Sequence, residues 1–390
     1  MQALKVHVTR FAPQLLLVGL AVVYVASSTT LRDVFVVGMT LAVAGLVLTA
    51  AQTDTGSKTF ARWGAGVLVV TLAGVAAFNY VVNPFGLYAT QYFEPIAFGT
   101  RNYKMDLYAT ADPRPEAIIL GSSRTFTVAP TQIRALWGLE TVNLSYPSGA
   151  MRDDLAMMRF IAEGGEMPKL IIISLSPERF ATIDYRVLEP DARLWDYLDD
   201  NSVVANLKTH FDRWTRLFSK EQIDASLRVV QAEIVGRPAV NLYFDADGMG
   251  HFDEREPTEG DFTMEALREN SWTLLFTEAD NPNMATDGLA RFERILKIAE
   301  AHNTVVIGYI PPVHPRFQAY LDANTDFAAI TTRLKAALDG LTAAYPSFQY
   351  SDFLRSEAFS DGQRLFYDIM HPTIEASALM MEMLHKQYGQ

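Results

Sequence analysis

Three long apolar segments occupy the first 83 residues of the chain. Residues 11–31 and 34–53 contain no charged side chain, and a third apolar run follows Trp63 and ends at Asn83. Because a helix rises about 1.5 Å per residue, about 20 residues cross the ~30 Å hydrocarbon core of a bilayer. The pattern therefore predicts a domain of three transmembrane helices in residues 1–83.

The first segment also has one feature of a secretory signal, because Lys5 and Arg10 precede its apolar run. Its uncharged stretch is longer than the ~7–15 apolar residues of a signal peptide, and two further apolar segments follow. Retained helices are therefore the favoured interpretation. The Lys and Arg residues of the N-terminus and of loop 52–62 predict that both lie in the cytoplasm. Three crossings then place the rest of the chain outside the cytoplasm.

Residues 84–116 are rich in aromatic side chains, among them Tyr88, Tyr92 and Tyr103. Aromatic residues next to a membrane span often sit at the level of the lipid headgroups. This stretch is predicted to be a juxtamembrane connector that lies on the bilayer. A role in substrate binding is the alternative.

Short apolar runs alternate with helix-like patterns from residue 117 to the C-terminus. Five runs are predicted to be strands: Ala117–Leu120, Thr141–Leu144, Lys169–Ser174, Thr304–Tyr309 and Phe348–Tyr350. Apolar residues at helical spacing are found at 152–163, 287–302, 325–343 and 373–387. This alternation is typical of a parallel sheet with helices on both faces. The fold class is therefore predicted to be α/β, with one extracytoplasmic domain over residues 117–390.

Residues 181–286 interrupt the alternation and are predicted to be a mostly helical insertion in this domain. Within it, residues 245–256 carry carboxylates at several positions of a calcium-binding loop. Met249 stands where such a loop needs an oxygen ligand, so a solvated or substrate-facing loop is the favoured interpretation. No metal site and no cofactor is predicted.

Charge and cysteine content narrow the functions that are open to the outer domain. Residues 1–83 hold only five of the 33 Lys and Arg and two of the 45 Asp and Glu, so the remainder is strongly acidic. A nucleic-acid partner, which would call for a basic surface, is not expected. The chain has no cysteine, which excludes disulfides, thiolate catalysis and cysteine-ligated zinc.

A small polar turn follows the first predicted strand. Gly121, Ser122, Ser123 and Arg124 come directly after its apolar run. Sites on parallel sheets lie beyond the carboxyl ends of the strands, so Ser123 is a candidate nucleophile. A structural turn is the alternative. A serine hydroxyl becomes a good nucleophile when a histidine, oriented by a carboxylate, takes its proton.

Two of the seven histidines are candidates at this edge of the sheet. His371 lies on a short loop before the last predicted helix, and Asp368 precedes it by three residues, within reach of one imidazole nitrogen. This loop follows the last strand and so comes to the same edge as Ser123; a solvated turn is the alternative. His314 also follows a strand end and is a candidate substrate contact, with a proline-rich turn as its alternative.

Taken in order, these residues resemble the SGNH (GDSL-like) hydrolase superfamily. The resemblance rests on residues 121–123 after the first strand, Gly149 after the second, and Asp368-x-x-His371 before the last helix. It looks like the membrane-anchored envelope branch, which includes the alginate O-acetylation proteins and the D-alanyl-lipoteichoic acid transfer protein. The segment LSPERF at 175–180 is similar to segments of that branch. The resemblance extends over most of residues 117–390 outside the insertion.

The resemblance implies a flavodoxin-like parallel sheet and a role for each matching residue. Ser123 would be the nucleophile, His371 the general base and acid, and Asp368 the carboxylate that orients it. The backbone N–H groups of Ser123 and Gly149 would face the oxyanion.

The chain departs from the superfamily pattern after the third strand. The asparagine that is usual there is absent, which removes an expected oxyanion donor. Asn143 and Ser176 are the candidates to replace it. Ser176, Arg124 and His314 are also candidate substrate contacts, and pairing with a neighbouring carboxylate is the alternative for Arg124.

The activity that the resemblance implies is acyl transfer, with acetyl as the favoured group, onto an envelope polysaccharide or a glycolipid. The acyl group would pass through an acyl-enzyme on Ser123. Because acyl-CoA is absent outside the cytoplasm, a multi-span membrane O-acyltransferase is the expected partner. The expected location is the inner membrane of a bacterium, with the catalytic domain in the periplasm. A stand-alone carbohydrate esterase and a catalytically inactive, glycan-binding assembly protein of an export complex are the alternatives.

Overall fold

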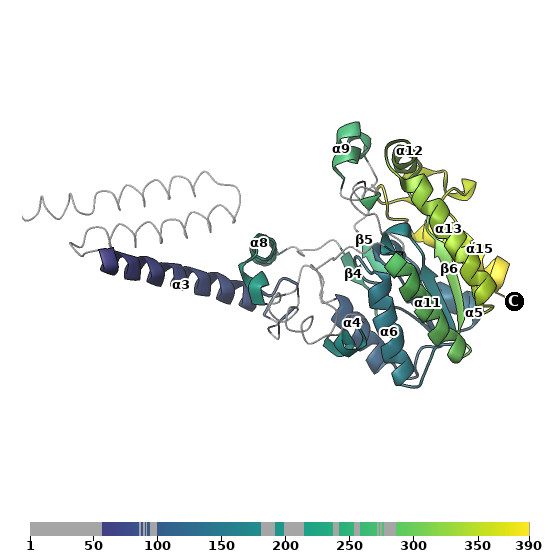
Figure 1. The fold of residues 1–390 in the computed structure, drawn as a ribbon, viewed down its shortest axis with the longest axis horizontal. Coiled ribbons are helices and arrows are strands. Elements are labelled where there is room, and N and C mark those ends of the chain that lie inside the picture. The colour runs from purple at the N-terminus through teal and green to yellow at the C-terminus, as the bar shows by residue number, and fades with distance from the viewer. Residues whose placement is uncertain are drawn as a thin grey trace, which may run out of the picture. The chain divides into compact units, whose positions relative to one another are not determined.

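The structure is a computed structural model. It describes residues 57–390 except for 86, 89, 91, 94–99, 181–191, 199–213, 237–241, 253–257, 271–272, 274, 277–285 and 390 (Figure 1). The first two predicted membrane segments, 11–31 and 34–53, therefore lie outside the described residues. The chain divides into two compact units. The first contains Met1–Gly99 and Leu207–Val240, and the second contains Thr100–Asn206 and Asn241–Gln390.

The first unit is built on helix α3 (Ser57–Val82), which covers the third apolar run. The short helix η4 (Arg216–Phe218) and helix α8 (Lys220–Val235) belong to the same unit. The buried Asn79 amide of α3 donates a hydrogen bond of 2.7 Å to the Leu217 carbonyl. Part of the predicted insertion therefore assembles with the N-terminal segment instead of the sheet domain. Among the residues with a described structure, none of the helices has the length and apolar character needed to span a bilayer.

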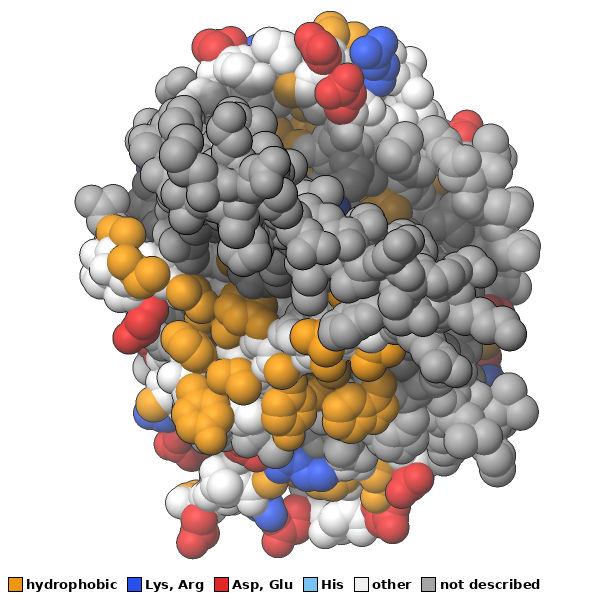
Figure 2. Space-filling view, turned by 90° about the vertical axis from the view of Figure 1, so that its left-hand side faces the viewer, with side chains coloured by type: hydrophobic (Ala, Val, Ile, Leu, Met, Phe, Trp, Pro, Cys, Tyr) orange, Lys and Arg blue, Asp and Glu red, His pale blue; other side chains and the backbone are white. Residues whose placement is uncertain are grey.

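Large apolar side chains are exposed on this unit. Hydrophobic side chains also gather on the face of the molecule shown in Figure 2. The exposed residues of α3, η4 and α8, with Trp214 beside them, are Leu68, Val69, Val70, Leu72, Val81, Trp214, Phe218, Ile234 and Val235. Exposed apolar surface of this kind is typical of a region that contacts lipid or another apolar partner.

The second unit contains a five-stranded parallel sheet. Its strands are β1 (Ala117–Leu120), β2 (Thr141–Asn143), β3 (Leu170–Ser174), β6 (Val305–Ile310) and β7 (Phe348–Asp352). Their order is β2-β1-β3-β6-β7, one of the two common orders of doubly wound sheets. All five predicted strands are present, so the predicted α/β class with a parallel sheet is confirmed. The order reverses between β1 and β3, which is where sites form on such sheets.

Helices cover both faces of the sheet (Figure 1). Helices α6 (Met151–Glu163), α11 (Thr286–Ala301) and α13 (Phe327–Ala344) pack on one face, and α5 (Pro130–Trp137) and α15 (Ile374–Tyr388) on the other. Successive strand residues point to opposite cores, so Ile118 joins the first core and Ile119 the second. Burial on both faces explains why β1 and β3 read as continuous apolar runs.

Several elements were not predicted. Helix α4 (Thr100–Thr110) lies in the predicted connector, and α12 (Pro315–Asn324) precedes α13. An antiparallel hairpin of β4 (Leu242–Phe244) and β5 (Gly250–Phe252) lies in the predicted insertion. The other short helices that the structure describes in this unit are η1 (Ser123–Thr125), η2 (Pro177–Phe180), η3 (Ala192–Tyr197), η5 (Glu259–Phe262), α9 (Met264–Glu269), η6 (Glu357–Phe359) and α14 (Gly362–Leu365).

The turn of this hairpin is anchored beside the carboxyl end of β2. Lys104 of α4 is buried and donates hydrogen bonds to the carbonyls of Asn143, at 2.6 Å, and of Gly248. Burial holds the pKa of Lys104 well below its usual value, and the charge of Asp247 opposes this shift only in part. The acidic turn itself pairs Asp245 Oδ2 with His251 Nε2 at 2.7 Å. The rest of the acidic stretch 245–256, residues 253–256, lies outside the described residues.

Candidate active site

The turn after β1 brings one of its two serines to the surface. The chain leaves β1 at Gly121 and enters η1 at Ser123. A Cβ at Gly121 would lie 2.1 Å from Thr125 Oγ1, so only glycine fits this tight turn. Ser122 is buried, and its hydroxyl has no hydrogen-bond partner among the described residues, whereas Ser123 is partly exposed. Ser123 is therefore the accessible hydroxyl of the pair.

Ser123, His371 and Asp368 form a continuous chain of hydrogen bonds. Ser123 Oγ lies 2.8 Å from His371 Nε2, although the two residues are 248 positions apart. His371 Nδ1 lies 2.7 Å from Asp368 Oδ2. Because the carboxylate accepts a hydrogen bond from the N–H at Nδ1, the lone pair is on Nε2, which can accept the serine hydroxyl proton. The structure thus brings the three predicted catalytic residues together.

The loop before α15 holds the histidine through the same aspartate. Asp368 Oδ1 accepts hydrogen bonds of 2.7 Å from the backbone N–H groups of Met370 and His371. An aspartate that bonds backbone groups two and three residues ahead fixes a tight turn. Burial raises the pKa of Asp368, but the charge of His371 and these hydrogen bonds outweigh it and lower the pKa to about 2. The carboxylate is therefore ionised throughout the neutral range.

Gly149 lies against the nucleophile turn. A Cβ on Gly149 would approach the Gly121 carbonyl oxygen to 2.5 Å, so a larger residue does not fit. The N–H of Gly149 donates to the Tyr146 carbonyl at 3.1 Å within its own turn. The predicted oxyanion donor is thus next to the nucleophile, but its hydrogen is already bonded. The N–H of Ser123, in contrast, has no backbone acceptor within the described part of the chain.

Asn143 has a structural role instead of the predicted oxyanion role. Its side chain is fully buried, and its amide nitrogen donates to the carbonyls of Thr125, at 3.0 Å, and Val128, at 2.9 Å. Its side-chain oxygen accepts the N–H of Ser145 at 3.0 Å. Both amide hydrogens are therefore used to fix the chain after the nucleophile turn.

The side chain of Arg124 is buried and bonds other groups of the protein. Its guanidinium is 1% exposed and lies 3.2 Å from Glu178 Oε1. The same group donates to the carbonyls of Pro311 and Pro312, at 3.1 and 2.7 Å. The guanidinium is therefore not available for a substrate contact. The alternative interpretation of Arg124, pairing with a neighbouring carboxylate, agrees with the structure. Ser176 is also fully buried, and its hydroxyl has no hydrogen-bond partner among the residues described.

His314 contacts the loop that carries Asp368 and His371. Its backbone N–H donates to the Ile369 carbonyl at 3.2 Å, and its Nδ1 accepts the Arg316 N–H at 3.2 Å, which caps α12. Burial, and then the charge of Arg316, lower the pKa of His314 to about 4 against the opposing effect of Asp368. The neutral imidazole lines a cavity of about 270 Å³ together with Phe262.

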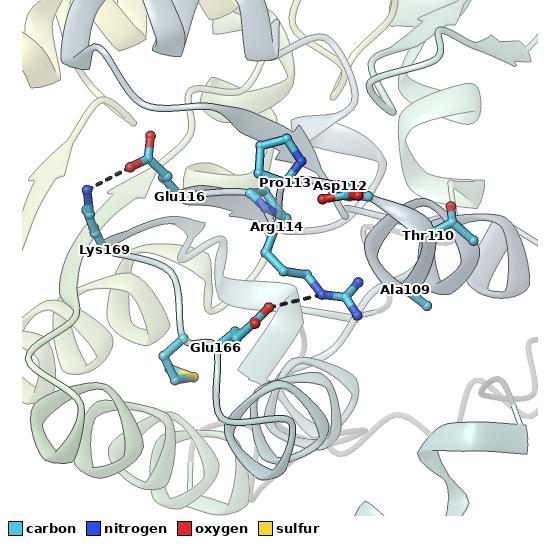
Figure 3. Close-up of a pocket in the computed structure, with 11 residues that line it drawn as sticks. Ala109, Thr110, Asp112, Pro113, Arg114, Glu116, Glu166 and Lys169 are labelled. Atoms are coloured by element: carbon cyan, nitrogen blue, oxygen red, sulfur yellow. Dashed lines mark hydrogen bonds and ion pairs between the residues drawn. The ribbon is translucent and has the colours of Figure 1, made fainter.

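A larger pocket of about 660 Å³ lies at the opposite edge of the sheet. It is bounded by residues 109–116, at the end of α4 and the start of β1, and by residues just before β3 (Figure 3). Arg114 pairs there with Glu166 at 3.3 Å, and Lys169 with Glu116 at 2.7 Å. This is the amino edge of the strands, whereas Ser123 lies at the carboxyl edge.

Two buried residues beside the site were not singled out in the sequence. Glu178 and Arg179 of η2 contact the turn after β1 and the loop after β2, respectively. The only sequence signal for them is their place in the LSPERF segment at a strand end.

The arrangement fits attack by a serine hydroxyl on an acyl carbon. A hydroxyl bonded to an imidazole, which is in turn oriented by an ionised carboxylate, has the geometry of acyl transfer catalysis. Comparison with known proteins does not identify a family: no protein-family model and no curated protein matches the chain.

Proposed function

We propose that the sheet domain is a serine-dependent acyl-ester enzyme of the SGNH type. It transfers an acyl group, with acetyl as the favoured one, onto an envelope polysaccharide or a glycolipid. One observation carries this proposal: the unbroken path from Ser123 Oγ through His371, at 2.8 Å, to Asp368, at 2.7 Å.

In the proposed reaction, Ser123 Oγ attacks the acyl carbonyl while its proton passes to His371 Nε2. Asp368 stabilises the resulting imidazolium. The tetrahedral intermediate collapses, His371 returns the proton to the departing oxygen, and the acyl group stays on Ser123 as an ester. An acceptor hydroxyl then attacks this ester, with His371 again taking a proton, and Ser123 regains it when the product leaves.

We place this reaction outside the cytoplasm, at the inner membrane of a bacterium. The support is the sequence of residues 1–83, with its apolar segments and its Lys and Arg residues on the loops assigned to the cytoplasm. Acyl-CoA is absent outside the cytoplasm, so a multi-span membrane O-acyltransferase delivers the acyl group in this proposal. A glycan hydroxyl receives it.

The test is active-site labelling of membranes that contain the full chain. A fluorophosphonate, which phosphorylates activated serines, should label wild type and should fail on Ser123→Ala and His371→Ala. Ser122→Ala is the matched control, because the buried Ser122 hydroxyl bonds no described residue. Labelling that persists in Ser123→Ala would show that another residue is the nucleophile, and absence of labelling in wild type would remove the enzyme proposal.

A stand-alone carbohydrate esterase would use the same residues with water as the acceptor. Turnover of simple aryl esters by the detergent-solubilised chain separates the two, since a transferase without its donor partner shows little of it.

A non-catalytic assembly protein is the second candidate function. It is favoured by the hydrogen bonding of the predicted oxyanion donors, because Gly149 N–H bonds Tyr146 and the Asn143 amide bonds carbonyls. This candidate predicts glycan binding that is the same in wild type and Ser123→Ala, with no fluorophosphonate labelling. Labelling at Ser123 would exclude it.

A further inference from the structure

Helix η2, directly after β3, places two consecutive charged residues inside the protein. Glu178 is 5% exposed and Arg179 is 2% exposed. Glu178 pairs with Arg124, the residue after Ser123, and Arg179 pairs with Asp154 of α6, which is fully buried. Four charged side chains are thus buried at the carboxyl edge of the sheet. We refer to Arg124–Glu178 and Arg179–Asp154 as the two buried ion pairs.

The first pair joins three strand ends. Arg124 lies in the turn after β1, and its partner Glu178 lies after β3. Arg124 also donates hydrogen bonds to the Pro311 and Pro312 carbonyls, which follow β6. Because Arg124 is bonded to Ser123 through the backbone, this pair fixes the turn that carries the nucleophile.

The second pair reaches the loop after β2. Arg179 Nε donates to the Gly149 carbonyl at 2.9 Å, and its other nitrogens donate to the Ser174 carbonyl and to Asp154 Oδ2. Gly149 is the residue that lies against the Gly121 carbonyl. This pair therefore holds the Gly149 loop against η2. The first pair holds the Ser123 turn against the same η2 segment.

Stability alone is a weak reason for such an arrangement. Removing two charges from water is costly, and replacing a buried ion pair by apolar residues of similar volume is often neutral or stabilising. A guanidinium does provide geometry, because its planar fork bonds several acceptors in fixed directions. Here both forks bond backbone carbonyls at strand ends around Ser123.

Fixed backbone geometry matters most for an oxyanion. Donors that stabilise the tetrahedral intermediate must already be in place when the charge develops, and removing one costs about 10²–10³ in rate. The ion pairs fix the Ser123 turn and the Gly149 loop, and these two segments meet at the Gly121 carbonyl.

We propose that the two buried ion pairs are positioning residues for acyl transfer. They hold the Ser123 turn, whose backbone N–H is the donor left to face the oxyanion, in a fixed position against the Gly149 loop. This inference rests on the proposed function. It adds Arg124, Glu178, Arg179 and Asp154 to the residues on which the rate depends, although none of them contacts the acyl group.

The main test replaces one pair by apolar residues. Arg124→Met/Glu178→Leu should keep the unfolding temperature within a few degrees of wild type. Its fluorophosphonate labelling should slow at least tenfold, through the maximal inactivation rate and not through the affinity for the probe. Arg134→Met/Glu140→Leu is the matched control, because this pair on the same domain is about half exposed, at 47% and 52%. The control should label at the wild-type rate.

A second variant covers the case in which the double variant does not fold. Arg179→Lys keeps the positive charge beside Asp154, but an ammonium does not reproduce the planar fork to Gly149 and Ser174. It should label at least tenfold more slowly while remaining folded. Wild-type labelling rates in Arg179→Lys, or in a folded Arg124→Met/Glu178→Leu, would overturn the proposal.

Amide hydrogen exchange gives a readout that does not depend on activity. In both variants, peptides covering 121–126 and 146–150 should exchange at least tenfold faster, while the β3 peptide 170–174 should be unchanged. If wild type is not labelled at all, the proposed function fails, and exchange still decides the inference. Unchanged exchange in 121–126 and 146–150 would overturn it.

Discussion

Asp368 has a side chain that is 51% exposed, yet its carboxylate accepts three hydrogen bonds at 2.7 Å. Two of these bonds shape its own loop and the third orients His371. A single residue therefore couples the local turn to the imidazole of His371. The sequence spacing Asp368-x-x-His371 predicted this pair because the two residues lie within one loop.

Replacing Asp368 with Asn should slow fluorophosphonate labelling by about 10³–10⁴, because an amide favours the wrong imidazole tautomer. The fold should be retained. Asp361→Asn on the neighbouring helix is the control, since Asp361 Oδ1 caps α14 and asparagine caps helices equally well. The comparison is made with labelling rates of the two variants; equal rates would remove the orienting role of Asp368.

His314 is 5% exposed, and its pKa is lowered to about 4 by burial and by Arg316. In the unfolded chain the His314 side chain has its ordinary pKa of 6.5, whereas in the folded protein it binds a proton only near pH 4. The stability linked to His314 is therefore fully present above pH 6.5 and is lost as the pH falls from 6.5 to 4. The loss is on the order of 2–3 kcal/mol.

His314→Asn should flatten this pH dependence, because asparagine can cap α12 in the same way but does not titrate. The measurement is the unfolding midpoint in urea at pH 7.5 and at pH 4.5. His302→Asn, at an exposed position, should keep the wild-type dependence. An unchanged slope in His314→Asn would show that other groups dominate this range; Asp368, with a pKa of about 2, acts only below pH 4.

At the scale of elements, the strands were predictable and the contacts between loops were not. The strands β1 and β3 are buried on both faces, so a continuous apolar run such as Ile171–Ile173 marks them in the sequence. The β4–β5 hairpin has no such run, because only three residues pair on each side. Its position depends on Lys104, a residue that lies 138 positions before β4 and whose burial no local pattern indicates.

We expect that Gly149, in the loop after β2, cannot be replaced by a larger residue without moving the loop. Gly149→Ala would place a Cβ 2.5 Å from the Gly121 carbonyl, so the loop must move away from the nucleophile turn. We expect labelling to slow at least tenfold. Gly340→Ala is the control, since its Cβ would meet nothing within 4 Å near the C-terminal end of α13, and it should label normally. Normal labelling of Gly149→Ala would mean that this loop does not contribute to the rate.

At the scale of the whole molecule, the chain forms two units whose borders differ from the predicted domains. The sequence suggested borders at residues 83 and 116, with an insertion at 181–286 inside the outer domain. In the structure, 207–240 joins the N-terminal unit, and the second unit begins at Thr100. Helix α8 has an apolar face, which sequence periodicity detects, but periodicity does not say which apolar surface that face will meet.

The absence of cysteine makes the proposed topology directly testable. In intact bacterial cells, a membrane-impermeant maleimide should label Arg268→Cys, at an exposed position of α9, and should label Ser57→Cys only after the cells are opened. The physical reason is the distribution of Lys and Arg around the apolar segments. Labelling of Ser57→Cys in intact cells, or protection of Arg268→Cys, would contradict this orientation.

The sequence by itself determined the α/β class, the five strands, the serine at a strand end and the Asp-x-x-His loop. These features are local, since burial on two faces and short-range turns leave a pattern within a few residues. Only the tertiary structure decided what each side chain at the sheet edge bonds. It paired Ser123 with His371 across 248 positions, placed Arg124 against Glu178, and directed the Asn143 amide to carbonyls. Such partners depend on which strands become neighbours, and strand order is set by the packing of the whole sheet.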